Sequence, residues 1–208
     1  MPDRQAHWEN VYATKREDEV SWFQENPALS LELIDAAGAT RESRIIDIGG
    51  GESRLVDLLL QRGFHLLSVL DLSETALAAA RARIGGEARN VEWVVADVTK
   101  WTPSRQYDIW HDRAAFHFLT DPDDRAAYVS RLKSALRPGG QAIIGTFALD
   151  GPEKCSGLPV QRYDGASLQA TLGNEFTILE ERRETHTTPW GSTQSFQFAR
   201  FQRAAAPT

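Results

Sequence analysis

A run of apolar residues that ends in an acid and three glycines constrains the fold of this chain more than any other feature. The run covers residues 45–48, contains Asp47 and is followed by Gly49, Gly50 and Gly51. Glycines permit positive φ angles and let a ligand approach the backbone. The segment that follows has helical periodicity, and the first free N–H groups of a helix can hold an anionic group. The pattern therefore predicts a strand that leads into a ligand-binding turn.

Two further apolar runs also end in an acid. One of them ends at Asp71 and the other at Asp97. Asp71 lies about 20 residues beyond the glycines, where a nucleotide-binding fold places the acid that contacts ribose. Parallel strands present their carboxyl ends along one edge of a sheet, so we expect Asp47, Asp71 and Asp97 to gather around one crevice.

With these motifs the chain resembles the class I S-adenosylmethionine-dependent methyltransferases, in particular their small single-domain bacterial type. The resemblance extends from about residue 40 to about residue 201. Residues 107–113 are similar to the family's fourth strand, residues 136–140 to the turn before its fifth strand, and residues 141–148 to that strand. The resemblance implies S-adenosyl-L-methionine as the cofactor and S-adenosyl-L-homocysteine as the product.

The resemblance also implies roles for individual residues. Asp71 would bind the ribose hydroxyls, Asp97 the adenine amino group, and the Val98 backbone the edge of the ring. Asp47 would face the methionine ammonium, and Asp112 would complete that end of the pocket. The other cofactor contacts that it implies lie beside these acids: Gly49, Gly50, Gly51, Ser53 and Leu72. Ser53 stands where the common G-x-G-x-G pattern has its third glycine, and a serine can still cap the following helix.

Two segments are candidates for a cover over this pocket. Residues 1–38 combine many charges with aromatic side chains, among them Tyr12 and Trp22. A helix packed against the domain explains these aromatics as well as a cover does, because aromatic rings supply contact area wherever they pack. In the second interpretation, which the resemblance supports, Tyr12 and Trp22 close over the methionine end. Residues 150–163 form a long loop after the fifth strand, and such loops border the crevice.

Ionisable residues interrupt the end of the predicted fourth strand. His111 is a candidate general base, with Asp112 either its orienting partner or a cofactor contact. Arg113 is a candidate clamp for a carboxylate. The alternative is an internal ion pair between Asp112 and Arg113 and a histidine that is only hydrogen-bonded. A dedicated base is required only if the acceptor is protonated.

The order of elements predicts an α/β fold. We expect a doubly wound, Rossmann-like three-layer sandwich with a mostly parallel seven-stranded sheet whose last strand is antiparallel. Helices are predicted to begin at Pro27, after a Ser73 cap and after an Asp121 cap. The expected division is an N-terminal helical cover at 1–38, the cofactor-binding domain at 39–203 and a tail at 204–208.

Composition limits the remaining possibilities. The 208 residues suit one domain, and a net charge of −6 with 41% hydrophobic residues disfavours nucleic acid as the substrate. No apolar run reaches the ~20 residues that span a bilayer, so we expect a cytoplasmic protein without membrane contact. The single cysteine, Cys155, excludes an intramolecular disulfide and provides no metal-ligand cluster.

The predicted function is methyl transfer to an acceptor that the sequence does not identify. A small molecule is the leading interpretation, and a protein lysine side chain is the alternative. Two further classes remain open: an NAD-dependent oxidoreductase, which shares the glycine turn, and a non-catalytic protein that only binds the cofactor. The oligomeric state is left open by the sequence.

Overall fold

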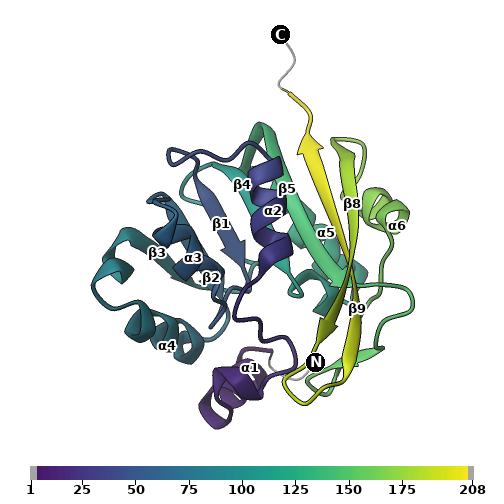
Figure 1. Ribbon diagram of the computed structural model, residues 1–208. Coiled ribbons are helices and arrows are strands. Elements are labelled where there is room, and N and C mark those ends of the chain that lie inside the picture. Colours follow the sequence, from purple (N-terminus) through teal and green to yellow (C-terminus); the bar gives the residue numbers. More distant parts are fainter. Residues whose placement is uncertain (1–3, 206–208) are drawn as a thin grey trace.

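The computed structural model describes residues 4–205, which are built around one seven-stranded sheet (Figure 1). The strands lie in the order β3-β2-β1-β4-β5-β9-β8. Their bounds are β1 Ile45–Ile48, β2 Leu67–Asp71, β3 Val91–Val95, β4 Tyr107–Arg113, β5 Leu136–Phe147, β8 Phe176–Thr187 and β9 Thr193–Arg203. The last strand, β9, is antiparallel to β5 and β8, and the other neighbours are parallel. The predicted sheet is confirmed.

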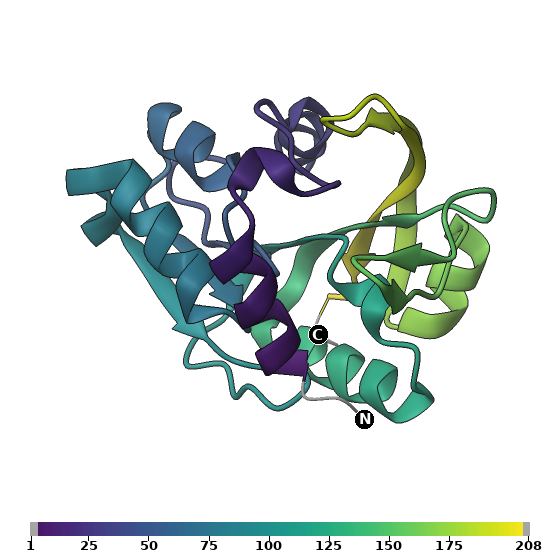
Figure 2. The ribbon, with the colours of Figure 1, turned by 90° about the horizontal axis from the view of Figure 1, so that it is seen from below.

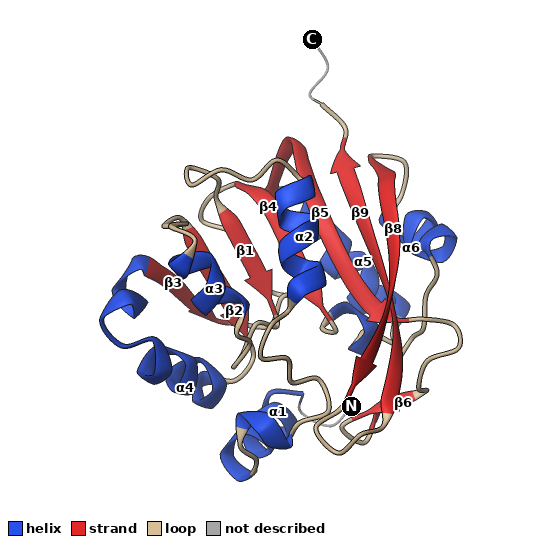
Figure 3. Ribbon diagram, in the orientation of Figure 1, coloured by secondary structure: helices blue, strands red, loops and turns tan. Residues whose placement is uncertain are grey.

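Helices cover both faces of the sheet, which gives three layers (Figure 3). Leu33, Leu59 and Leu77 bring α2, α3 and α4 into one hydrophobic core cluster, and Leu132 and Leu168 bring α5 and α6 into the other. The helices are α1 Arg4–Thr14, α2 Ala28–Ala36, α3 Leu55–Gln61, α4 Glu74–Ile84, α5 Pro122–Ala135 and α6 Gly165–Leu172. Short elements complete the chain: the 3₁₀ turns η1 Glu17–Glu19, η2 Gly85–Asn90 and η3 Phe116–Phe118, and the small hairpin of β6 Lys154–Cys155 and β7 Leu158–Pro159.

Side-chain caps fix the starts of two helices as predicted. The Ser73 hydroxyl accepts the Ala76 N–H at 3.1 Å, and the Asp121 carboxylate accepts the Asp123 N–H at 2.9 Å. Each bond satisfies one of the backbone donors that the first helical turn leaves free. The prediction for α2 is wrong by one position, because Pro27 is the residue before the helix and not its first residue.

Residues 136–140, which were predicted to form a turn before the fifth strand, instead form the first part of β5. Leu136 already pairs with Tyr107, and Gln141 pairs with Ile109, so the glycine-containing segment between them belongs to β5. The register shift leaves more residues on β5 than on β4 between these pairs. Gly139, with φ of 76°, lies in this irregular part of the strand.

The register of the parallel strands aligns their carboxyl ends. Ile48 pairs with Leu70 on one side and with Asp112 on the other, and Asp71 pairs with Val95. In the view from below, α1 crosses this edge of the sheet (Figure 2). Residues from three strands therefore meet beneath one helix.

The predicted division of the chain remains a prediction. Residues 1–3 of the expected cover and residues 206–208 of the expected tail lie outside the described part of the chain. Within it, α1 lies at the strand ends, whereas α2 packs on the face of the sheet. Among the helices of residues 4–205, none has the length and apolar character that crossing a membrane requires.

We expect Gly145→Ala to destabilise the protein. A Cβ atom at Gly145 would lie 2.6 Å from the ring of buried Phe198, and overpacking of this kind typically costs ~1–3 kcal/mol. Gly86→Ala is the control, because no heavy atom lies within 4 Å of a Cβ there. Urea denaturation of the three proteins measures the free energies of unfolding. Equal values for the two variants would contradict the packing described here.

Candidate active site

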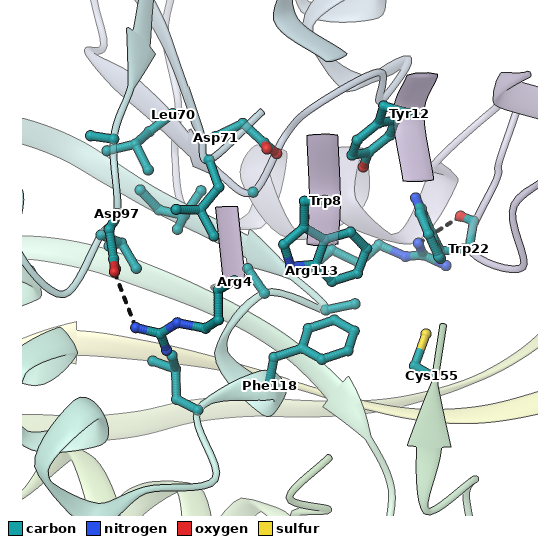
Figure 4. A pocket seen from close by; sticks show the side chains of 18 residues that line it. Arg4, Trp8, Tyr12, Trp22, Leu70, Asp71, Asp97, Arg113, Phe118 and Cys155 are labelled. Atoms are coloured by element: carbon teal, nitrogen blue, oxygen red, sulfur yellow. Dashed lines mark hydrogen bonds and ion pairs between the residues drawn. The ribbon is translucent and has the colours of Figure 1, made fainter. Parts of the chain in front are cut away.

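A cavity of about 760 Å³, including space open to solvent, lies between α1 and the carboxyl ends of the strands. Asp71 and Asp97 form one side of it, and Trp22, Arg113 and Cys155 lie at the other (Figure 4). A second pocket, lined in part by residues of the glycine turn, adjoins it and shares some of the same residues.

Backbone atoms of the glycine turn come close to neighbouring strands. A Cβ at Gly49, whose φ is 66°, would lie 2.6 Å from the Cβ of Ala115. A Cβ at Gly50 would lie 2.6 Å from Val69 and 2.7 Å from a carboxylate oxygen of Asp47. Any side chain at these two positions would collide with atoms of the protein, so the turn has room only for glycine there.

Asp71 ends β2 in the wall of the cavity, and Leu72 lines it as well. The carboxylate accepts the Ser73 N–H at 2.9 Å. Burial raises the pKa of Asp71 to about 7, and the nearby negative charge of Asp47 also raises it. Near neutral pH, Asp71 is therefore present both protonated and ionised. A ligand whose hydroxyl groups donate hydrogen bonds to it would favour the ionised form.

Asp97 and Val98 line the same cavity farther along the edge of the sheet. Asp97 accepts hydrogen bonds from the Thr99 N–H at 2.9 Å and the Thr99 hydroxyl at 2.7 Å. The Arg4 guanidinium of α1 also donates to it, at 3.1 Å (Figure 4). Burial alone would raise the pKa of Asp97, but the Thr99 hydrogen bonds and the charge of Arg4 hold it below the usual value.

Asp47 lies at the second pocket in a buried chain of hydrogen bonds. His111 Nδ1 is 2.7 Å from its Oδ1 atom, and His111 Nε2 is 2.9 Å from the Ser30 hydroxyl. All three side chains are buried. The predicted pairing of His111 with Asp112 is wrong, because successive side chains of a strand point to opposite faces of the sheet.

Asp112 belongs to the opposite face. It accepts hydrogen bonds from the Tyr128 hydroxyl at 2.7 Å and from the N–H groups of Ala115 and Phe116 at 2.9 and 3.1 Å. Burial raises the pKa of Asp112 to about 6. The side chain is fully buried and does not line the cavity, so it supports the loop after β4 from beneath.

Arg113 is largely buried and lines both pockets. Its Nη1 donates to the Trp22 carbonyl at 3.0 Å, and its Nη2 is 3.7 Å from Glu184. Its carbon Cζ lies 4.7 Å from the centre of the Phe196 ring. The alternative ion pair with Asp112 is wrong for the same geometric reason as the His111 pairing.

The cover over the cavity is an aromatic cluster on and after α1. Trp8 lies 4.9 Å from Phe118 and 5.7 Å from Trp22 between ring centres, and Tyr12 lies 6.3 Å from Trp22. Glu9 fixes the helix to α4, where its carboxylate accepts the N–H of Glu74 at 2.7 Å. Tyr12 and Trp22 are thus at the cavity, as the sequence predicts.

The remaining predicted contacts lie at the turn itself. Gly51 lies beside the Tyr12 hydroxyl and the Asp71 carboxylate. Ser53 lines the second pocket, and its hydroxyl accepts the Leu55 N–H at 3.1 Å. In the described residues 4–205, no group of three or more His, Cys, Asp or Glu side chains could hold a metal ion.

Several residues of the two pockets were not singled out from the sequence as site residues, and four of them have polar or aromatic side chains that bear on the site. They are Arg4, Trp8, Ser30 and Cys155. Trp8 belongs to the aromatic-rich segment 1–38, and the density of aromatic residues there could have indicated a role at the pocket. Cys155 belongs to the 150–163 loop that was expected to border the crevice, although the residue itself was not singled out. No motif marks Arg4 or Ser30, and the packing of distant elements brings them to these pockets.

Residues 45–140 match the model of a family described as a methyltransferase domain. A malonyl-[acyl-carrier protein] O-methyltransferase of Paenibacillus sp. (strain JDR-2) is 30% identical over 54% of this chain and 42% of its own. A trans-aconitate 2-methyltransferase of Rhizobium rhizogenes is 31% identical over 60% of this chain and 46% of its own. The chain spans about half the length of the curated relatives that it matches.

Among solved structures, the fold is similar to that of the N-methyltransferase NodS from Bradyrhizobium japonicum in complex with S-adenosyl-L-homocysteine. The TM-score is 0.73 at 18% identity, and the match covers 97% of this chain and 99% of the other. At this identity the likeness shows the fold alone. It extends over the whole sheet, including the antiparallel end.

The cavity fits the cofactor that the family uses. The turn has no side chains at Gly49, Gly50 and Gly51, so a ligand can approach its backbone. Asp71 and Asp97 line the cavity at successive strand ends. Carboxylates at these points suit the hydroxyl and amino groups of a nucleoside. Aromatic rings at the other end suit a sulfonium cation.

We expect the affinity for S-adenosyl-L-homocysteine to rise with pH through about 7. Below its pKa of about 7 Asp71 carries a proton and accepts hydrogen bonds less well, whereas above it the carboxylate can accept both ribose hydroxyls. Calorimetry from pH 6 to pH 8.5 measures this change. Asp71→Asn should lose the pH step and, at high pH, ~1–3 kcal/mol of binding free energy. If the affinity of the variant still rises with pH in the same way, the pH dependence belongs to a group other than Asp71.

The sequence match, the fold and the shape of the cavity agree with one another. The match begins at β1 and ends within β5, so it contains the glycine turn, Asp71 and Asp97. Through these residues, this part of the chain is similar to a methyltransferase domain.

Proposed function

We propose that the protein transfers the methyl group of S-adenosyl-L-methionine to a small organic molecule. The observation that carries this proposal is the shape of the cavity, in which the carboxylates of Asp71 and Asp97 lie opposite an aromatic end roofed by α1. Trp8, Trp22 and Phe118 supply that end. An apolar end covered by a helix in this way suits a small acceptor better than a long polypeptide.

The names of the two sequence relatives support a small acceptor. One name specifies a malonyl group on a carrier protein and the other specifies trans-aconitate, which are both carboxylic acids. The relatives are similar to this chain over only part of their length. We therefore extend to this protein only the class of acceptor, a small molecule, and not a particular compound.

The residues of this chain contribute mainly by position. The cofactor, when bound, supplies a methyl group that its sulfonium already activates. Asp71 and Asp97 hold the nucleoside, so the methyl group faces the aromatic end in a fixed orientation. Trp8, Trp22 and Phe118 exclude water from the line along which the acceptor attacks. An acceptor that is already deprotonated needs no general base.

We infer that His111 acts on Asp47 and not on the acceptor. Both ring nitrogens are within hydrogen-bond distance of buried groups, Asp47 and Ser30, so neither is free to take a proton from a ligand. The imidazole holds the Asp47 carboxylate in one orientation beside the glycine turn. A carboxylate fixed there can accept hydrogen bonds from the ammonium group of the cofactor.

We expect His111→Gln to weaken the binding of S-adenosyl-L-homocysteine, because Asp47 loses the partner that orients it. The pH profile of methyl transfer should keep its shape. Calorimetry and the pH dependence of the rate measure the two effects. A catalytic base would give the reverse result: unchanged affinity, a lower rate and the loss of the acidic limb of the profile.

The function is tested first by calorimetry with S-adenosyl-L-methionine and S-adenosyl-L-homocysteine. Transfer of a labelled methyl group from the cofactor into a cell extract, separated by size, then identifies the acceptor class. We expect label in small metabolites. Label in a protein band would support the lysine methyltransferase alternative. Tight NAD binding without methyl transfer would support an oxidoreductase, and cofactor binding without any transfer would support a non-catalytic protein.

A further inference from the structure

A buried guanidinium lies at the end of the cavity opposite the predicted nucleoside contacts. It belongs to Arg113, the last residue of β4, and its neighbours in Figure 4 are Trp8 and Trp22. The Trp22 carbonyl accepts one of its N–H groups, and the Phe196 ring stacks against its carbon Cζ. These contacts fix the side chain in one place without using all of its donors.

Two nitrogens of this guanidinium, Nε and Nη2, are buried and have no hydrogen-bond partner. They form one edge of the planar group, and that edge matches the two oxygens of a carboxylate. The nearest acid is Glu184, whose Oε2 is 3.7 Å from Nη2, beyond hydrogen-bond distance, and also lacks a partner. The other oxygen of Glu184 accepts the Gln24 amide at 3.1 Å.

A third unpartnered donor belongs to the loop after β4. His117 Nδ1 accepts the Phe147 N–H at 3.2 Å, which places the ring proton on Nε2, an atom without a partner. Burial, and then the charge of Arg113, lower the pKa of His117 to about 3, so the ring is neutral. His117 Nε2 is thus one more buried donor without a hydrogen-bond partner, in a ring whose pKa responds to Arg113, and unmet buried donors are costly.

We propose that the methyl acceptor carries a carboxylate, which binds side-on to the Nε and Nη2 edge of Arg113. The inference rests on the proposed function and specifies its substrate class. An apolar body next to the carboxylate suits Trp8, Trp22 and Phe118, which border the same space. Glu184 balances the guanidinium when no acceptor is bound, and the five donors of an arginine allow it to serve both acids.

The probe for this site is phenylacetate, which joins an aromatic body to a carboxylate, and phenylacetamide is its uncharged counterpart. Both are titrated by calorimetry into the wild-type protein saturated with S-adenosyl-L-homocysteine. We expect phenylacetate to bind at least about tenfold more tightly, because its bonds to the guanidinium are charge-assisted. In Arg113→Gln the two probes should bind equally, while the affinity for S-adenosyl-L-homocysteine stays within twofold of wild type.

The carboxylate of the cofactor itself is the other group that this guanidinium could bind. 5′-Methylthioadenosine, which lacks that carboxylate, separates the two sources. If Arg113→Gln weakens S-adenosyl-L-homocysteine but leaves 5′-methylthioadenosine unchanged, the guanidinium serves the cofactor and the proposal is overturned. Equal binding of the two phenyl probes to the wild-type protein overturns it as well. Failure of S-adenosyl-L-homocysteine to bind wild-type protein would instead refute the proposed function.

Glu184→Gln gives a second test that leaves the guanidinium in place. Removing the neighbouring negative charge should tighten phenylacetate binding several-fold and leave phenylacetamide unchanged. This variant decides the question if Arg113→Gln does not fold. Weaker or unchanged phenylacetate binding in Glu184→Gln would overturn the proposal, because the carboxylate would then not be bound beside Glu184.

Discussion

Close approach of the backbone after β1 to its neighbours is the constraint on which the cavity depends. The Gly49 N–H donates to the Leu70 carbonyl at 2.7 Å, and the positions of a Cβ at Gly49 and Gly50 are already filled by atoms of Ala115, Val69 and Asp47. The turn thus lies flat against the sheet. A larger residue would push it outward and close the space between the strand ends and α1.

The same edge of the sheet concentrates acids, and each acid is stabilised differently. Asp97 is held ionised by Thr99 and Arg4, whereas burial leaves Asp71 with a pKa of about 7. Asp47 has the imidazole of His111 within hydrogen-bond distance. A cavity with this excess of carboxylates favours a ligand that supplies hydroxyl, amino and cationic groups, and S-adenosyl-L-methionine supplies all three.

The cover is joined to the domain by polar contacts at the start and in the middle of α1 and by aromatic contacts. Arg4 donates to Asp97 and to Asp124, and Glu9 accepts N–H groups at the start of α4. These contacts are partly exposed and individually weak. Because Arg4 contacts the acid expected to bind adenine, the position of the cover and the binding of the cofactor involve the same carboxylate.

The sequence by itself determined the sheet and one side of the cavity. Apolar runs that end in acids, a glycine turn and capping residues are local patterns, and parallel strands place the ends of such runs at one edge. From these patterns the positions of Asp71 and Asp97 could be predicted. The presence of Tyr12 and Trp22 at the cavity was one of two interpretations of an aromatic-rich segment, and the family resemblance supported it. The errors at Pro27 and in the first part of β5 concern the boundaries of elements, which local patterns fix least well.

Only the tertiary structure decided which side chains pair. His111 and Asp112 are neighbours in the sequence but point to opposite faces, so one meets Asp47 and Ser30 and the other meets Tyr128. The partners come from other strands and helices, at separations that no local pattern encodes. A buried polar group takes whichever partner the packing brings within reach, because an unmet hydrogen bond in the interior costs more than a change of partner.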